Sequence, residues 1–282
     1  MNDIISSETD GPFNLEHLLQ VVEKLRDPGS GCPWDIEQSF KSIVSSTLEE
    51  CYELVDAIEK EDFSHVEEEL GDVLFQVVFY AQMGKENSLF DLASVIDTLV
   101  RKLIRRHPHV FGSLKEIPLY DWDDGNQKMN VAEVKDTWEK IKSQERSAKN
   151  QGSVLDDVPL ALPSLSRAQK IQKRASRAGF DWRDHAGPLD KIQEELLELR
   201  GSLSAGDMYQ VKSELGDLLF SCVNLSRHLN LDAEESLRFA TKKFERRFET
   251  MENNAALSGR SVKDLSMSDY DILWEKAKSS GL

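Results

Sequence analysis

Cysteine is scarce in this sequence, which has three in 282 residues: Cys32, Cys51 and Cys222. Their number is odd, their positions are scattered, and no two of them have the spacing of paired metal ligands. This pattern excludes a disulfide framework of the kind that stabilises small secreted domains. A protein of the reducing cytoplasm fits it best.

Long hydrophobic runs are also absent. The longest stretch without a charged residue runs from Val73 to Gly84, well short of the ~20 apolar residues that span a bilayer. The amino terminus, MNDIISSETDG, has neither the basic region nor the apolar core of a signal peptide. We therefore expect no membrane-spanning segment and no secretion signal.

Basic residues are in the minority, with 35 lysines and arginines against 51 aspartates and glutamates and a net charge of −16. Such a charge repels the backbone of nucleic acids and the surface of anionic membranes. We therefore expect no nucleic-acid partner and no membrane partner. A small anionic ligand can still bind if a cation bridges it to the protein.

Sustained two-residue alternation, the pattern of a half-buried strand, is missing as well. Apolar residues instead recur at intervals of three and four, as in Leu48, Cys51, Tyr52, Val55 and Ile58. The sequence therefore predicts an all-α fold.

Several short patterns predict where the helices begin and end. Proline at 108 is expected to end the helix that carries Arg105 and Arg106, because proline cannot continue it. A loop is expected from Gly112 to Asn130. Pro188 is expected in the first turn of a helix. Helix starts are also predicted at three pairs with the spacing of a capping box: Ser46 with Glu49, Thr47 with Glu50, and Ser64 with Glu67.

The two halves of the chain repeat five short segments in the same order, which indicates a duplication. The intervening segment 151–164, QGSVLDDVPLALPS, has the composition of a linker. We therefore expect an N-terminal tail (1–11), a first domain (12–150), the linker and a second domain (165–282), each domain a bundle of about four helices. The repeated segments are GCPWD, LEECYEL, ELGDVLF, RKLIRRHPHVF and WEKIK in the first half, and GFDWRD, QEELLEL, ELGDLLF, KKFERRF and WEKAK in the second.

Paired carboxylates are the chemically informative part of the repeat. Residues three apart lie on one face of a helix, and 15 residues separate the two pairs in each half, enough for a turn between antiparallel helices. Four carboxylates that converge would repel one another unless a hard divalent cation such as Mg²⁺ neutralised them. The pairs are Glu50 and Glu53 with Glu69 and Asp72, and Glu195 and Glu198 with Glu214 and Asp217.

A solvated acidic face is the alternative interpretation, and it stays open for Glu50 and Glu53, which lie opposite the apolar stripe of their helix. The helix around Asp217 differs, because one polar strip runs down an otherwise apolar surface. Such a helix is expected to be buried, and Gly216 is expected to permit a close approach. A structural polar network is still possible there. The strip consists of Gln210, Glu214, Asp217, Ser221, Asn224 and His228.

Together, the acidic pairs, ELGDLLF, KKFERRF and WEKAK resemble the MazG family of nucleoside triphosphate pyrophosphohydrolases, in its tandem two-domain bacterial form. The resemblance covers nearly the whole chain. It implies a homodimer of all-α subunits that hydrolyses nucleoside triphosphates to the monophosphate and pyrophosphate with Mg²⁺. Control of the nucleotide pool is the role that this activity suggests.

The resemblance also implies roles for individual residues. The eight paired carboxylates match the magnesium ligands, and those of the second half (Glu195, Glu198, Glu214 and Asp217) are the predicted catalytic set. The alternative for the basic residues is that they are ordinary solvated cations, and the alternative for the tryptophan is that it is a core residue. The predicted nucleotide-binding residues are Lys191, Asn224, Lys243, Arg246, Arg247 and Trp274, with Lys102, Arg105, Arg106 and Trp138 in the first half.

The two halves are not equivalent. Ser46, Phe79 and Met83 stand in the first half where the second has Lys191, Asn224 and His228. The second half is therefore predicted to carry the main activity, and the first to be a weaker, differently selective or structural copy. The opposite assignment keeps some force, because the first half retains its carboxylates and basic residues.

Two other classes of protein can also carry acidic residues on packed helices. A carboxylate-bridged di-iron bundle needs Glu-x-x-His motifs, and none occurs in the sequence. A non-catalytic helical interaction module, with its acidic faces merely solvated, is the second. Release of pyrophosphate from a nucleoside triphosphate separates the enzyme from that module.

Overall fold

The computed structural model describes residues 12–111, 130–148 and 153–279, and all the regular structure in these ranges is helical. The predicted all-α fold is confirmed. The predicted tail (1–11) and the predicted loop, except for Asn130, lie outside the described residues. No helix in the described ranges is long and apolar enough to cross a membrane.

The chain divides into two units, Met1–Gln144 and Glu145–Leu282, and each unit contains one copy of the repeat. The division falls within α7 (Val131–Ala148), a few residues before the end predicted for the first domain. Part of the predicted linker packs onto the second unit, since Arg174 donates hydrogen bonds to the carbonyls of Asp156 and Asp157.

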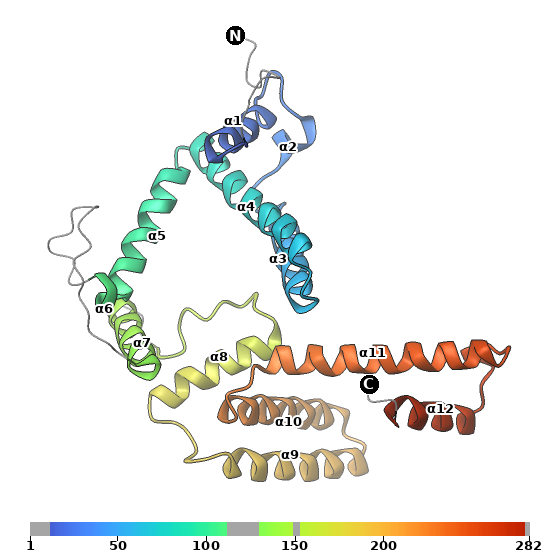
Figure 1. Ribbon diagram of the computed structural model, residues 1–282. Coiled ribbons are helices and arrows are strands. Elements are labelled where there is room, and N and C mark those ends of the chain that lie inside the picture. The colour runs from blue at the N-terminus through green and yellow to red at the C-terminus, as the bar shows by residue number, and fades with distance from the viewer. Residues whose placement is uncertain (1–11, 112–129, 149–152, 280–282) are drawn as a thin grey trace. The chain divides into compact units, whose positions relative to one another are not determined.

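In the first unit, α3 and α4 form a hairpin, and α1 and α5 also pack against α4 (Figure 1). The buried core lies between α1, α4 and the start of α3, where Val22, Val78, Phe79 and Met83 are shielded from solvent with Ile43. The helices are α1 (Leu15–Leu25), α2 (Pro33–Glu37), α3 (Val44–Glu59), α4 (Phe63–Glu86), α5 (Leu92–Arg106), α6 (Pro108–Phe111) and α7.

In the second unit, α9 and α10 form the corresponding hairpin, and α8 and α11 pack beside it (Figure 1). Gly206 ends α9 with a left-handed backbone (φ 73°), and the Asp207 side chain caps α10. The turn is tight because glycine adopts this conformation without strain. The elements are α8 (Ser164–Arg177), α9 (Ala186–Ala205), α10 (Met208–His228), α11 (Ala233–Leu257), the 3₁₀ helix η1 (Val262–Asp264) and α12 (Met267–Ser279).

The predicted capping boxes are wrong. Helix α3 begins at Val44, and its N-cap residue, Ile43, has no side-chain cap. Thr47 instead bonds to the Ile43 carbonyl from within the first turn, at 2.9 Å. Helix α4 is capped by Asp62, whose carboxylate accepts from the His65 amide, so Ser64 lies inside the helix. The end of α5 before Pro108 is as predicted, although a four-residue helix, α6, follows.

The predicted apolar stripe of α3 is not buried in the single chain: Leu48 and Tyr52 are about half exposed. The prediction of α10 as a largely buried helix is also wrong, because Leu219 and Phe220 are exposed. A Cβ atom added at Gly216 would meet nothing within 4 Å, so no close approach explains that glycine within the chain. Each hairpin therefore buries one of its paired carboxylates, Glu69 or Glu195, while several of its apolar side chains stay exposed.

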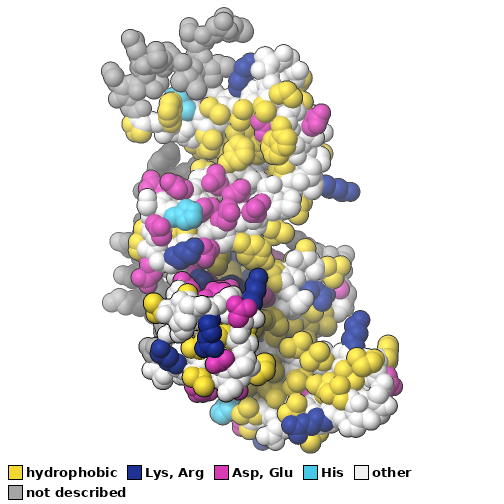
Figure 2. All heavy atoms as spheres, turned by 90° about the vertical axis from the view of Figure 1, so that its right-hand side faces the viewer, with side chains coloured by type: hydrophobic (Ala, Val, Ile, Leu, Met, Phe, Trp, Pro, Cys, Tyr) yellow, Lys and Arg dark blue, Asp and Glu magenta, His cyan; other side chains and the backbone are white. Residues whose placement is uncertain are grey.

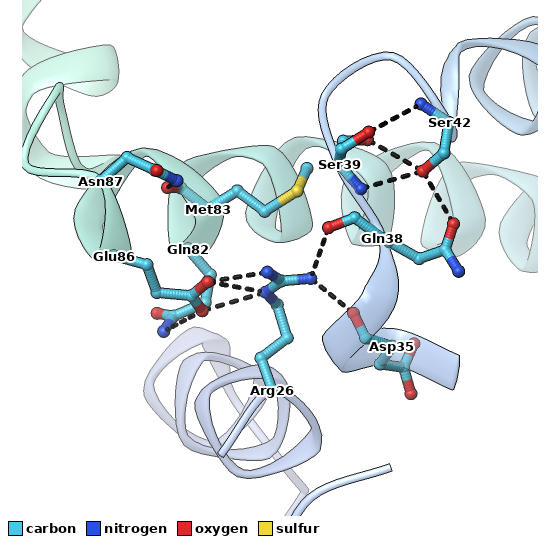
Figure 3. A network of polar contacts seen from close by, with 9 residues as sticks. All are labelled: Arg26, Asp35, Gln38, Ser39, Ser42, Gln82, Met83, Glu86 and Asn87. Carbon is cyan, nitrogen blue, oxygen red and sulfur yellow. Dashed lines mark hydrogen bonds and ion pairs between the residues drawn. The ribbon is translucent and has the colours of Figure 1, made fainter. Parts of the chain in front are cut away.

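A buried arginine joins three helices of the first unit (Figure 3). The Arg26 side chain is 7% exposed, and its Nη2 lies 2.7 Å from Oε2 of Glu86 in α4. Its Nη1 donates to the backbone carbonyls of Asp35 and Gln38, which belong to the segment around α2. The GCPWD segment is thereby fixed to the carboxyl end of α4.

We expect Arg26→Met to lower the free energy of unfolding by about 3 kcal/mol at pH 7, because it leaves the half-buried Glu86 carboxylate without its cation and two backbone carbonyls without their donor. Partial burial acts to raise the pKa of Glu86, but hydrogen bonds from Arg26 and Gln82 outweigh it and hold the pKa below the ordinary 4.5. A lowered carboxylate pKa stabilises the fold above pH 4.5, and this contribution disappears as the pH falls through the folded-state value.

Urea unfolding at pH 7 and at pH 3 measures both effects. Arg101→Met, which breaks the exposed ion pair with Asp97, is the control and should cost at most about 0.5 kcal/mol. The interpretation of Arg26 fails if its substitution costs no more than that of Arg101, or if the difference from wild type grows as the pH falls.

Candidate metal and nucleotide site

The helical hairpin of each unit brings three predicted carboxylates together. One oxygen from each of Glu195, Glu214 and Asp217 lies within 4.8 Å of the others. The first unit has the same arrangement, built from Glu50, Glu69 and Asp72. Each cluster draws one residue from the first helix of its hairpin and two, three apart, from the second.

The fourth predicted carboxylates, Glu53 and Glu198, lie outside these groups of three but act on them. Desolvation raises the pKa of Glu214, and the neighbouring charges of Glu198, Glu195 and Asp217 raise it further. In the first unit, desolvation and then the charges of Asp72, Glu53 and Glu69 raise the pKa of Glu50. These carboxylates therefore repel one another, and a bound cation would relieve the repulsion.

The burial of one carboxylate in each cluster indicates whether a cation fits the site. Glu69 is 6% exposed and Glu195 is 4% exposed. Oε2 of Glu69 has no hydrogen-bond partner in the described part of the chain, although burying a charged oxygen without a partner is costly. Oxygen donors in this number suit Mg²⁺ or another hard divalent cation. The residues present fit such an ion.

Each buried glutamate also contacts one basic side chain through its Oε1 atom. Lys191 Nζ lies 2.6 Å from Oε1 of Glu195, and His65 Nε2 lies 2.6 Å from Oε1 of Glu69. Sequence reasoning found Lys191 but missed His65. The signal was its position four residues before Glu69 on the same helix, which is the spacing of Lys191 and Glu195.

The structure pairs each predicted tryptophan with a predicted arginine. Arg247 lies over the Trp274 ring at 5.8 Å in the second unit, and Arg106 lies over Trp138 at 5.9 Å in the first. Phe244 also packs on Trp274, with ring centroids 5.5 Å apart. The repeat therefore preserves a cation–π contact, which both interpretations of Trp274 allow.

The other basic residues are less closely associated with the carboxylates. Lys243 and Arg246 are exposed on α11, where Lys243 lies over the Phe239 ring. Helix α11 packs against α8, α10 and α12. No described contact joins Lys243 or Arg246 to Glu214 or Asp217. In the first unit, Arg105 is exposed and Lys102 is half-buried on α5.

The polar strip of α10 continues into a network at the end of the helix. Asn224 is 7% exposed, and its Oδ1 accepts hydrogen bonds from Nε and Nη2 of Arg227. Arg227 and His228 both bind the carboxylate of Asp181 in the GFDWRD segment. The equivalent first-unit residues, Phe79 and Met83, lie in the apolar core, so the difference between the halves that the sequence shows is built into their packing.

Comparisons with known proteins agree with this geometry. A model of the MazG nucleotide pyrophosphohydrolase domain matches the chain twice, over residues 38–111 and 183–251. The nucleoside triphosphate pyrophosphohydrolase of Escherichia coli K12 is 44% identical over 94% of this chain and 97% of its own length. The nucleoside triphosphate pyrophosphohydrolase/pyrophosphatase MazG of Thermotoga maritima is 45% identical over 94% of this chain and 95% of its own.

The fold and the site place the protein among all-α proteins whose duplicated helical hairpins carry carboxylate clusters able to hold a metal ion. Within that class, the two domain matches and the full-length relatives identify one family. The chain belongs to the MazG family of nucleotide pyrophosphohydrolases and is an enzyme of that kind.

Proposed function

We propose that the protein hydrolyses nucleoside triphosphates to the nucleoside monophosphate and pyrophosphate, with Mg²⁺ held by the carboxylates of α9 and α10. The names of the full-length relatives support the substrate class. The observation that carries the proposal is the cluster of Glu195, Glu214 and Asp217, which is repeated in the first unit by Glu50, Glu69 and Asp72.

The residues of the site would have different roles in the reaction. Glu195, Glu214 and Asp217 would hold the cation, and Glu198 would complete the acidic face beside them. When bound, the cation would stabilise negative charge on phosphate oxygens and acidify a water molecule. Lys191 stands next to the cluster and would donate to the substrate's phosphates as charge builds up on them.

Arginines of α11 and the tryptophan of α12 would also contact the nucleotide. Arg246 and Arg247 can form bidentate contacts with phosphate oxygens, which suits a triphosphate chain. Trp274 presents an aromatic face that already stacks with Arg247 and could stack with a base. In the first unit, Lys102, Arg105, Arg106 and Trp138 are proposed for the same roles.

Product identification tests the proposed reaction. With Mg²⁺ present, we expect each turnover to release one monophosphate and one pyrophosphate, and we expect chelation of the metal to reduce the rate to background. Anion-exchange chromatography of the products measures this. Release of a diphosphate and orthophosphate would place the cut at the other phosphoanhydride bond and contradict the proposal.

We further propose a homodimer formed through the apolar faces of the hairpins. Hydrophobic side chains gather on the surface beside an acidic patch (Figure 2). Leu70 and Leu74 of α4 are about half exposed, and so are Leu215 and Leu219 at the repeated positions of α10. A second copy would cover these side chains, since exposed apolar patches that recur in a repeat favour an interface.

The double variant Leu74→Glu/Leu219→Glu should therefore be monomeric, because it places a charge within the proposed interface of each unit. Light scattering coupled to size-exclusion chromatography should show the mass fall from two chains to one. Leu257→Glu changes another exposed leucine, at the end of α11, and should leave the dimer intact. A monomeric wild type would overturn the proposal.

The cellular setting is proposed on more general grounds. All three cysteines are free, which supports the reducing cytoplasm. The net charge of −16 supports a small-molecule substrate with no nucleic-acid or membrane partner. Hydrolysis of nucleoside triphosphates there would serve the control of the nucleotide pool.

A further inference from the structure

In the side-chain amide of Gln172 on α8, only one of the two polar atoms forms a hydrogen bond among the described residues. The residue is 5% exposed, and its Nε2 donates to the Phe220 carbonyl of α10 at 2.8 Å. Its Oε1 is buried and has no partner among the described residues. The Phe220 carbonyl can only accept, so it fixes the orientation of the amide and leaves Oε1 as an unused acceptor.

A second glutamine on the same helix shows the contrast. Gln169 donates from Nε2 to the Leu231 carbonyl at 2.8 Å and accepts at Oε1 from the Ala233 amide at 3.0 Å. Both ends of its amide are occupied by backbone, as expected of a structural residue. A buried acceptor left unpaired costs about 1–3 kcal/mol, so the free oxygen of Gln172 calls for a donor that the chain itself does not supply.

Asn224 presents the complementary group nearby. Arg227 can only donate, and it holds Asn224 Oδ1 with two hydrogen bonds of 3.0 and 2.7 Å. This leaves the Nδ2 group, a donor, unused among the described residues. Asn224 follows Phe220 by one helical turn, and Gln172 of α8 contacts the Phe220 carbonyl, so both residues lie beside the same turn of α10.

The pair of amides lies at a suitable distance from the proposed metal site. Asn224 is seven residues after Asp217 on the same polar strip, or about 10 Å along the helix axis at about 1.5 Å per residue. A nucleotide whose phosphates lie at the carboxylates could place its base in this region. The base would have to displace the side chains that cover Oε1.

We propose that Gln172 and Asn224 read the edge of the base, with Gln172 Oε1 accepting from an exocyclic amino group and Asn224 Nδ2 donating to the adjacent ring nitrogen. This inference rests on the proposed function. Adenine and cytosine carry that arrangement of donor and acceptor, whereas hypoxanthine and uracil carry a carbonyl oxygen beside a ring N–H. The second half therefore favours bases with an amino group.

Matched pairs of substrates test this most sharply: ATP against ITP, and CTP against UTP. The full chain is used in a Glu50→Ala background, so that hydrolysis reports on the second half. We expect kcat/KM to favour the amino-bearing member of each pair by about tenfold or more, since one lost hydrogen bond to a buried amide has this effect. Gln172→Met should reduce each preference to within about threefold, while Gln169→Met should retain it.

The outcomes separate the two proposals. If the wild type and the Glu50→Ala protein release no pyrophosphate from any nucleotide, the proposed function itself fails. If they hydrolyse all four with equal or reversed preference, only the role of Gln172 and Asn224 is overturned, whether or not Gln172→Met folds. An unchanged preference in a folded Gln172→Met protein, checked by thermal unfolding, overturns it as well.

Discussion

Replacing Glu195 with alanine should reduce kcat/KM for pyrophosphate release by a factor on the order of 10³, because it removes a predicted ligand of the cation that stabilises charge on the phosphates. Glu50→Ala should reduce it much less. Glu195 is buried in contact with Lys191, and its unit keeps a polar strip beside the cluster. The first unit has Phe79 and Met83 in its core at the matching places.

Steady-state kinetics of both variants at saturating Mg²⁺ measure the difference. Glu252→Ala, which removes an exposed carboxylate from α11, is the control and should retain activity. A larger loss from Glu50→Ala than from Glu195→Ala would assign the main activity to the first unit. Equal losses would mean that both units contribute.

Neutralising one carboxylate in each cluster should stabilise the metal-free protein and abolish its stabilisation by Mg²⁺. The double variant Glu50→Gln/Glu214→Gln removes the two groups whose pKa values are raised by desolvation and by neighbouring carboxylates. A carboxylate with a raised pKa binds its proton more tightly in the folded state. The stability of the metal-free wild type should therefore fall as the pH rises above 4.5 through the folded-state values.

Thermal unfolding with and without Mg²⁺ at pH 7 tests this. A cation present at 100 times its dissociation constant should stabilise each unit of the wild type by about 2.7 kcal/mol, and the double variant should gain almost nothing. Glu37→Gln/Glu252→Gln makes the same change in net charge at exposed positions and should respond to Mg²⁺ like the wild type. A full Mg²⁺ response in the Glu50→Gln/Glu214→Gln protein would exclude these carboxylates as ligands.

The sequence was sufficient to predict the features that depend on local geometry. Residues three apart on a helix share a face wherever the helix lies, so Glu214 with Asp217 and Glu69 with Asp72 could be paired in advance. The interval between the pairs left room for one tight turn, which the structure places at Gly206 and Asp207. The repeat supplied the rest, because two copies of one pattern make a chance arrangement improbable.

The features that depend on tertiary packing were not predictable in this way. The stripe from Leu48 to Ile58 looked like the buried face of its helix, but Glu50 faces α4 and much of the stripe is exposed. Helix caps were misplaced because a serine followed by a glutamate also occurs inside helices, and Asp62 was the stronger competitor. The link between Arg227 and Asp181 joins segments 46 residues apart, and no local pattern indicates it.

The most direct test of the account is to locate the metal. Crystals of the full chain soaked with Mn²⁺, an anomalous scatterer that takes the same oxygen ligands as Mg²⁺, should show a peak between Glu195, Glu214 and Asp217, with carboxylate oxygens about 2.2 Å from it. An anomalous map without a peak at either carboxylate cluster, from crystals that bind Mn²⁺ elsewhere or not at all, would contradict the proposed site and the chemistry built on it.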